Sequence, residues 1–156
     1  MKKYQVVGIG NAVVDVITQS TDAFLTEMGI EKGIMQLVET ERSEELFSAM
    51  DERVQTPGGS VANTIAGIGS LGLATGFIGR VRDDELGRFY ADAMTREGID
   101  FVNAPVAGGE LPTSRSMIFV SPDGERSMNT YLGISAELGP DDVDESVAAG
   151  AEVVFL

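Results

Sequence analysis

Residues 57–81 read PGGSVANTIAGIGSLGLATGFIGRV, and their pattern indicates a turn, a helix, a second turn and a strand. The first four residues interrupt regular secondary structure, and the helix expected at 61–71 carries apolar side chains at i, i+4 and i+7. A second stripe of small residues on this helix lets a sheet approach its backbone closely. Gly72 ends the helix, and a central strand is expected at 74–81.

The rest of the chain alternates between strand-like and helix-like segments. Further helices are expected near 22–28, 43–52, 83–98 and 140–149, and further strands near 4–10, 12–18, 34–38, 101–106, 115–120, 125–132 and 152–156. Ser121-Pro122-Asp123-Gly124 is a hairpin signal because proline fixes φ and glycine accepts a positive φ. This order predicts an α/β fold with a three-layer core and a small β appendage.

Composition excludes several classes of function. The 156 residues carry a formal net charge of −14, which repels nucleic acid and anionic membranes. There is no cysteine and no histidine, so disulfides, thiolate metal sites and histidine catalysis are absent, and we expect no metal site. The stretch from Thr56 to Gly79 has no charge, but its many glycines make it too broken for a membrane span. The N-terminus lacks the pattern of a secretory signal, so the expected location is the cytoplasm.

The segment GIGNAVVDV, residues 8–16, is the second informative stretch. A dinucleotide fingerprint needs a third glycine where Val13 stands and a helix where AVVDVI favours a strand, so a dinucleotide-dependent oxidoreductase is disfavoured. Asp15 lies in an apolar extended run, and burying its carboxylate without a partner would be unfavourable. It is either on the exposed face of an alternating strand or at the strand edge where open α/β sheets bind ligands.

A second candidate for ligand binding is the turn before the central helix. Gly58 and Gly59 would let a ligand approach the backbone, and Asn63 in the first helical turn can both donate and accept hydrogen bonds. The alternative is a capped helix without a ligand.

These motifs together resemble the ribokinase or PfkB family of sugar and nucleoside kinases. The resemblance rests on G-x-G-N-x-x-x-D at 8–15, GGSVANTIAGIGSLG at 58–72 and GFIGRVRDDELG at 76–87, and it covers essentially the whole chain. The hairpin PTSRSMIFVSPDGERSMNTYLG at 112–133 is similar to the family's next segment, with an adenosine-kinase-like character. The resemblance implies a ribokinase-like three-layer core with a small β lid, here incomplete. Its lid strands would lie within 12–18, 34–38 and parts of 101–132.

The resemblance also implies a reaction and a set of contacts. ATP, with Mg²⁺, would transfer its γ-phosphoryl group to a hydroxymethyl oxygen of a sugar or nucleoside, with adenosine as the first candidate. Asp15 would bind acceptor hydroxyls, Gly58, Gly59 and Asn63 would complete that site, and Arg126 would approach the phosphates. A guanidinium suits an anionic transition state, although Arg126 could instead pair with Asp123 or Glu125 on the hairpin surface.

Two departures from the family pattern stand out. The second signature of the family, a D-T-x-G-A-G-D-like segment with the catalytic base, is absent, so no catalytic base is expected in residues 1–156 and the ATP site is expected beyond Leu156. Ser114 stands where many relatives have glycine. We therefore expect one N-terminal part of a kinase domain, inactive by itself, in a protein that is a monomer or a homodimer. The alternative is a non-catalytic module that binds nucleosides or sugars.

Overall fold

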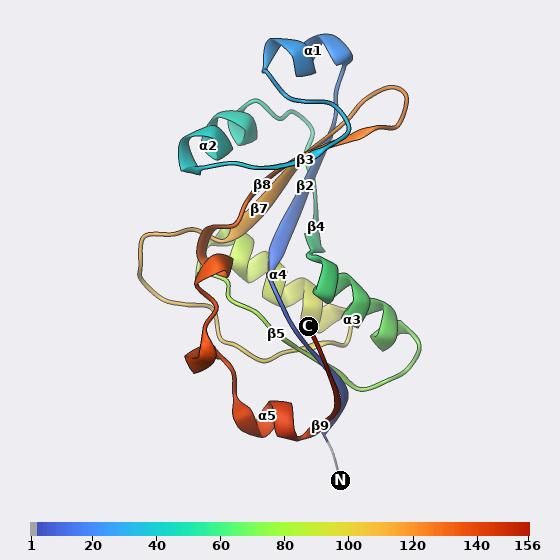
Figure 1. The fold of residues 1–156 in the computed structure, drawn as a ribbon, viewed down its shortest axis with the longest axis vertical. Helices are drawn as coiled ribbons and strands as arrows, with labels where there is room; N and C mark the ends of the chain where they lie inside the picture. The colour runs from blue at the N-terminus through green and yellow to red at the C-terminus, as the bar shows by residue number, and fades with distance from the viewer. Residues whose placement is uncertain (1–2) are drawn as a thin grey trace.

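The computed structural model describes residues 3–156, which form two sheets that lie one above the other along the long axis of the molecule (Figure 1). The first sheet is parallel and has the order β6-β5-β1-β9. Its strands are β1 (Tyr4–Ile9), β5 (Thr75–Ile78), β6 (Asp100–Phe101) and β9 (Ala151–Phe155). Among the described residues, no helix is long and apolar enough to cross a membrane.

Helices cover both faces of this first sheet and give the predicted three-layer α/β core. One face packs against α3 (Ser60–Ser70) and α4 (Glu85–Arg96), and the other packs against α5 (Glu145–Ala149). The small-residue stripe of α3 has the predicted effect: a Cβ on Gly69 would lie 3.1 Å from Thr75 Oγ1 on β5. The helix therefore packs more closely on the sheet than larger side chains would permit.

The second sheet is mixed and has the order β3-β8-β7-β2-β4. Its strands are β2 (Val13–Gln19), β3 (Met35–Leu37), β4 (Val54–Gly58), β7 (Ser114–Val120) and β8 (Arg126–Tyr131). Two helices, α1 (Asp22–Glu27) and α2 (Thr40–Ser48), lie beside this sheet, whereas α4 lies between the two sheets in the view of Figure 1. The hairpin between β7 and β8 is confirmed, with Gly124 at a φ of 86°.

Strand β4 was not predicted, because Pro57 and the two glycines after it are typical of a turn. It lies at the edge of the second sheet, where a proline removes no hydrogen bond that a neighbour needs. The strand expected at 101–106 was too long: β6 ends at Phe101, and Val106 forms only an isolated bridge with Arg82.

Other boundaries also differ from the sequence prediction. Helix α2 begins at Thr40 and ends at Ser48, earlier at both ends than predicted. The helix expected at 140–149 is two elements, the 3₁₀ turn η2 (Pro140–Asp142) and α5, because Asp144 is extended and caps α5 through its carboxylate. A further 3₁₀ helix, η1 (Gly133–Glu137), follows β8. Strand β9 lies at the edge of the first sheet, and Val153 on it is 54% exposed.

Candidate functional site

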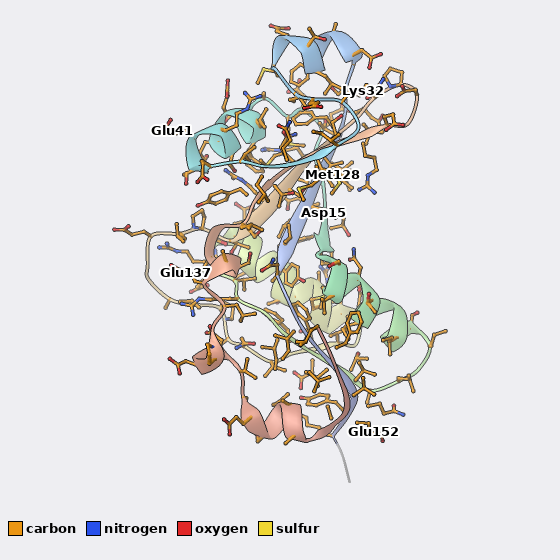
Figure 2. All side chains as sticks on the ribbon, in the orientation of Figure 1. Asp15, Lys32, Glu41, Met128, Glu137 and Glu152 are labelled. Carbon is orange, nitrogen blue, oxygen red and sulfur yellow. The ribbon has the colours of Figure 1, made fainter. Side chains whose placement is uncertain are left out.

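The two faces of the second sheet have different surroundings. Side chains alternate along β2, so Val14 and Val16 face the core that includes residues of α1 and α2, whereas Asp15 lies on the opposite face. The strand register places Thr56, Ser116 and Thr130 on the same face as Asp15. Figure 2 labels Asp15 on β2 and Met128 on β8, two strands away in this sheet. We call this surface the Asp15 face.

Asp15 is partly buried and has no hydrogen-bond partner among residues 3–156. Burial raises the pKa of its carboxyl group, and the positive charge of Arg126 opposes that shift to a smaller extent. A partly desolvated carboxylate without a donor is unfavourable in a folded protein. It is therefore available to accept hydrogen bonds from a ligand.

Gly58 and Gly59 have different structural roles. A Cβ on Gly58 would lie 2.6 Å from the carboxylate oxygens of Asp15, so glycine provides the space that this carboxylate occupies. Gly59 has a φ of 100°, and a Cβ there would overlap with the carbonyl oxygen of Asn11. Gly58 thus shapes the surroundings of Asp15, whereas Gly59 allows the turn from β4 into α3.

Asn63 lies in the first turn of α3 and is exposed. Its backbone N–H donates to the carbonyl of Gly59 at 2.8 Å, and its side chain makes no hydrogen bond within the described part of the chain. The structure therefore places Asn63 just after the two glycines with its amide free, but gives it no direct contact with Asp15.

Arg126 is exposed at the start of β8, opposite Val120 in the register. It is four residues along β8 from Thr130, about 13 Å at about 3.3 Å per residue. It forms no ion pair with any residue from 3 to 156, and Asp123 pairs instead with Lys32 at 2.5 Å. The surface pairing considered for Arg126 does not form, so its guanidinium is free to meet an anion.

The sequence prediction missed a row of polar side chains across the Asp15 face. Thr56 on β4, Ser116 on β7 and Thr130 on β8 stand in register with Asp15. The hydroxyls of Ser116 and Thr130 are 2.9 Å apart and form a buried hydrogen bond. The alternation of SRSMIFV and RSMNTY was a signal for strands, but it could not show which strand neighbours which.

The next row along the same face is apolar. Val54, Ile17, Ile118 and Met128 follow one another across β4, β2, β7 and β8, and Met35 extends the row onto β3. The side chains at the two ends of this row, Val54 and Met35, are 63% and 56% exposed. In the middle of this row Ile118 is fully buried, whereas Ile17 and Met128 are partly exposed. The Asp15 face thus joins a polar strip to a partly exposed apolar strip, which suits a ligand with hydroxyls at one end and an apolar ring at the other.

Ser114, the departure noted in the sequence, is fully buried at the start of β7. Its hydroxyl donates to the carbonyl of Tyr131 at 2.8 Å. The side chain is therefore occupied within the sheet.

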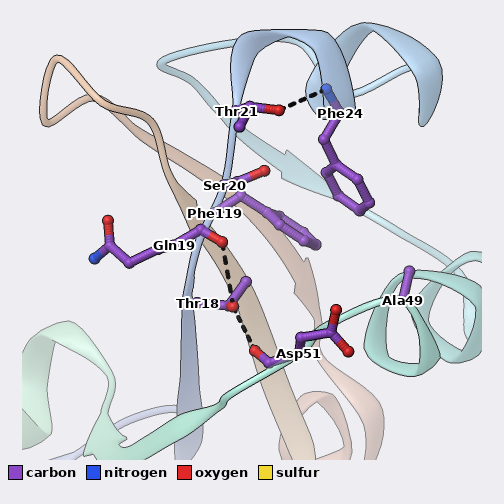
Figure 3. Close-up of a pocket in the computed structure, with 8 residues that line it drawn as sticks. All are labelled: Thr18, Gln19, Ser20, Thr21, Phe24, Ala49, Asp51 and Phe119. Atoms are coloured by element: carbon purple, nitrogen blue, oxygen red, sulfur yellow. Dashed lines mark hydrogen bonds between the residues drawn. The ribbon is translucent and has the colours of Figure 1, made fainter.

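A separate pocket of about 210 Å³ opens at the far end of β2 (Figure 3). It is lined by residues of β2, α1, β7 and the segment after α2: Thr18, Gln19, Ser20, Thr21, Phe24, Ala49, Asp51 and Phe119. Thr18 and Phe119 point away from the Asp15 face, and Phe24 packs on Phe119 with ring centroids 5.6 Å apart. This pocket is therefore distinct from the Asp15 face.

The described residues contain no cluster of three or more His, Cys, Asp or Glu side chains that could hold a metal ion. The chain continues from β1 through Gly10 into β2 and not into a helix, so the helix N-terminus required by a dinucleotide fingerprint is missing there.

Comparison with known proteins identifies the class. Residues 30–156 match the family described as pfkB family carbohydrate kinase, so the chain belongs to that family. The crystal structure of adenosine kinase from Sinorhizobium meliloti is 48% identical with a TM-score of 0.88, and the match covers 97% of this chain and 46% of that one. A probable sugar kinase protein from Rhizobium etli CFN 42 is 43% identical with a TM-score of 0.88, covering 99% of this chain and 46% of that one. These matches confirm the ribokinase-like α/β fold.

Curated relatives have several different substrates in their names. A 5-dehydro-2-deoxygluconokinase of Geobacillus thermodenitrificans is 44% identical over 117 residues, which are 72% of this chain and 35% of the relative. A fructokinase of Klebsiella pneumoniae is 38% identical over 85 residues, which are 54% of this chain and 27% of the relative. The chain spans about half the length of the solved structures above and a smaller part of these two relatives.

Proposed function

We propose that the protein containing this chain is an ATP-dependent kinase that phosphorylates a hydroxymethyl group of a nucleoside or sugar, and that residues 1–156 form its acceptor-binding half. The observation that carries this proposal is the Asp15 carboxylate, which is partly buried and lacks a hydrogen-bond partner among residues 3–156. Ribose and sugar hydroxyls supply the donors that this carboxylate lacks. Membership of the pfkB family supports the reaction class.

Adenosine is our first candidate for the acceptor. The polar strip around Asp15 fits ribose hydroxyls, and the partly exposed Ile17 and Met128 on the neighbouring apolar strip fit the face of a purine. A hexose would leave the apolar strip in contact with water or with another part of the protein. The similarity to the adenosine kinase of Sinorhizobium meliloti supports the same choice.

The second sheet would then be the lid of the site. It carries the Asp15 face on one side, and its strands β2, β3, β7 and β8 overlap the ranges that the family resemblance implies for the lid. A lid that covers the acceptor excludes water, which would otherwise compete with the acceptor hydroxyl for the phosphoryl group.

Arg126 is our candidate for a contact to the phosphates of ATP. Its guanidinium is exposed and unpaired within residues 3–156, which suits an anionic ligand. ATP with Mg²⁺ supplies the phosphoryl group, and the remaining contacts to it, together with the catalytic base, are expected outside this chain. What residues 1–156 provide is the position and orientation of the acceptor hydroxyl.

The test is an acceptor screen with the full-length protein. Release of ADP from ATP and Mg²⁺ is measured with adenosine, other nucleosides, ribose, fructose and 5-dehydro-2-deoxygluconate, and adenosine is expected to give the highest kcat/KM. Highest activity with a hexose would contradict the choice of adenosine, and no activity with any acceptor would contradict the kinase. Binding of adenosine without turnover would instead support a non-catalytic binding module.

A further inference from the structure

Helix α4 connects the two sheets through side chains on one of its faces. Asp84, which caps the helix, Gly87 and Tyr90 are spaced three residues apart and therefore face the same direction. Asp84 and Gly87 belong to the motif GFIGRVRDDELG, and the proposed function gives neither residue a role. Asp84 and Gly87 lie against Thr113, the residue before β7, and Tyr90 contacts Gly58, the last residue of β4. Strands β7 and β4 are the two neighbours of β2.

The first connection joins Asp84 to Thr113, the residue before β7. One carboxylate oxygen of Asp84 accepts from the N–H of Gly87 at 2.8 Å and from the hydroxyl of Thr113 at 2.7 Å. The other oxygen accepts from the N–H of Thr113 at 2.9 Å. Thr113 is fully buried, so these charge-assisted bonds are shielded from water. The start of β7 is thus fixed to the first turn of α4.

The second connection joins Tyr90 to Gly58, the last residue of β4. The ring of Tyr90 is fully buried and packs against Phe77 of β5 and Phe101 of β6, with centroids 6.4 Å and 5.6 Å away. Its hydroxyl donates to the carbonyl of Gly58 at 3.0 Å. Burial, with a smaller effect from the charge of Asp15, raises the pKa of Tyr90, so the hydroxyl keeps the proton that it donates. Tyr90 therefore links the aromatic core of the first sheet to β4.

Both connections act on the surroundings of Asp15. Strands β4 and β7 are the two neighbours of β2, which carries Asp15. Gly58 is also the residue over which the Asp15 carboxylate lies, because a Cβ there would be 2.6 Å from the carboxylate oxygens. A shift of the Gly58 backbone would change the space that the carboxylate occupies.

We propose that Tyr90 is a positioning residue for acceptor binding, which acts on Asp15 through the carbonyl of Gly58. This inference rests on the proposed function, because it concerns the same Asp15 site. Tyr90 is fully buried, so an acceptor on the Asp15 face does not touch it: its ring belongs to the core of the first sheet, and only its hydroxyl reaches β4.

The test compares Tyr90→Phe with Tyr131→Phe in the full-length kinase. Tyr131 is a matched control, because it is 5% exposed and its hydroxyl also makes one hydrogen bond, at 3.2 Å with Thr40. It lies on β8 one residue after Thr130, so it faces away from Asp15. Both variants keep the aromatic ring and remove one buried hydroxyl.

We expect Tyr90→Phe to raise the KM for the acceptor by about 2- to 10-fold, the range for one lost hydrogen bond, with the KM for ATP unchanged. Tyr131→Phe should leave both KM values near wild type. In an Asp15→Ala background, the effect of Tyr90→Phe on the acceptor should disappear, because the group that it positions is gone. An equal effect of the two tyrosine variants, or the same loss in the Asp15→Ala background, would overturn the inference.

A crystal structure of the Tyr90→Phe variant separates this inference from the proposed function. We expect the Gly58 carbonyl and the Asp15 carboxylate to be displaced from their positions relative to β7. An unchanged Asp15 carboxylate would refute the positioning role even in a highly active kinase. If no acceptor is phosphorylated, the proposed function fails, whereas the displacement still decides whether Tyr90 positions Asp15.

Discussion

Replacing Gly58 by alanine is expected to weaken acceptor binding while the fold stays intact. The new Cβ would lie 2.6 Å from the Asp15 carboxylate, well inside van der Waals contact. The group that it meets is the end of a side chain, which can rotate away without moving the backbone. Gly58 is a strand residue without a positive φ, so alanine adopts its conformation without strain. The carboxylate, and not the fold, should therefore be displaced.

The size of the effect follows from the bonds that the carboxylate would make. A hydrogen bond to a charged group contributes about 1.5–3 kcal/mol, and about 1.4 kcal/mol is tenfold in affinity. Displacement of Asp15 should therefore raise the Kd for the acceptor by about 10- to 100-fold. Stability should change by less than about 1 kcal/mol, because a strained rotamer costs about 0.5–1.5 kcal/mol and alanine regains about 0.4–1 kcal/mol by restricting the unfolded chain.

Gly59→Ala is the matched control, with the opposite expectation. Gly59 has a φ of 100°, and its Cβ would overlap with the backbone carbonyl of Asn11, which cannot rotate away. We expect a loss of at least about 1–3 kcal/mol in the free energy of unfolding, as is typical for a residue in a disfavoured backbone region. The two neighbouring glycines thus separate binding from stability.

The assay is isothermal titration of the acceptor into both full-length variants, together with thermal unfolding of each. Gly58→Ala should combine a near wild-type Tm with weak acceptor binding, while ATP binding is unchanged. The reasoning would be refuted if Gly58→Ala bound the acceptor as tightly as wild type. It would also be refuted if its affinity fell only in proportion to a lower Tm, because the glycine would then serve the fold and not the carboxylate.

Three further changes test other parts of the structure. Burial raises the pKa of Asp15, so its charged form is disfavoured in the folded state, and the contribution of Asp15 to stability should fall as pH rises through that pKa. Asp15→Asn should therefore raise Tm at pH 7 relative to wild type by an amount that shrinks on acidification, as calorimetry can show. The same titration should weaken acceptor binding as pH falls, and a pH-independent KM for wild type would contradict it. Gly87→Ala should destabilise the fold by about 3 kcal/mol or more in urea unfolding, because its Cβ would overlap with the carbonyl of Arg82; unfolding at the wild-type midpoint would argue against this packing. Asp142→Ala removes an ion pair in which Nη1 of Arg80 donates to both carboxylate oxygens, at 2.8 and 3.1 Å. It should lower stability by about 2 kcal/mol without changing acceptor affinity, whereas changed affinity at unchanged Tm would contradict a structural role.

Local pattern was sufficient for much of the fold. The helix after Gly59 and the turn at Gly124 follow from apolar periodicity and from the backbone freedom of glycine, which depend on neighbours in the sequence. The charge of Asp15 within an apolar run was also enough to mark it as a candidate, because a carboxylate there needs a partner or solvent.

Strand β4 was missed because its place in the sheet cannot be read locally. Pro57 and the glycines beside it are typical of a turn. The segment is a strand only because it pairs with β2 at the edge of the second sheet. The same limit applies to the end of β6, which depends on where that strand finds a neighbour.

The sequence by itself determined the α/β class and the family resemblance and marked Asp15 as a candidate site residue, because these depend on residue type and short spacing. Only the tertiary structure decided what surrounds that carboxylate. Thr56, Ser116 and Thr130 align with Asp15 through strand register, and Tyr90 reaches Gly58 from a helix of the other sheet. Register and packing between distant segments are set by the whole core, so no local stretch of sequence contains them.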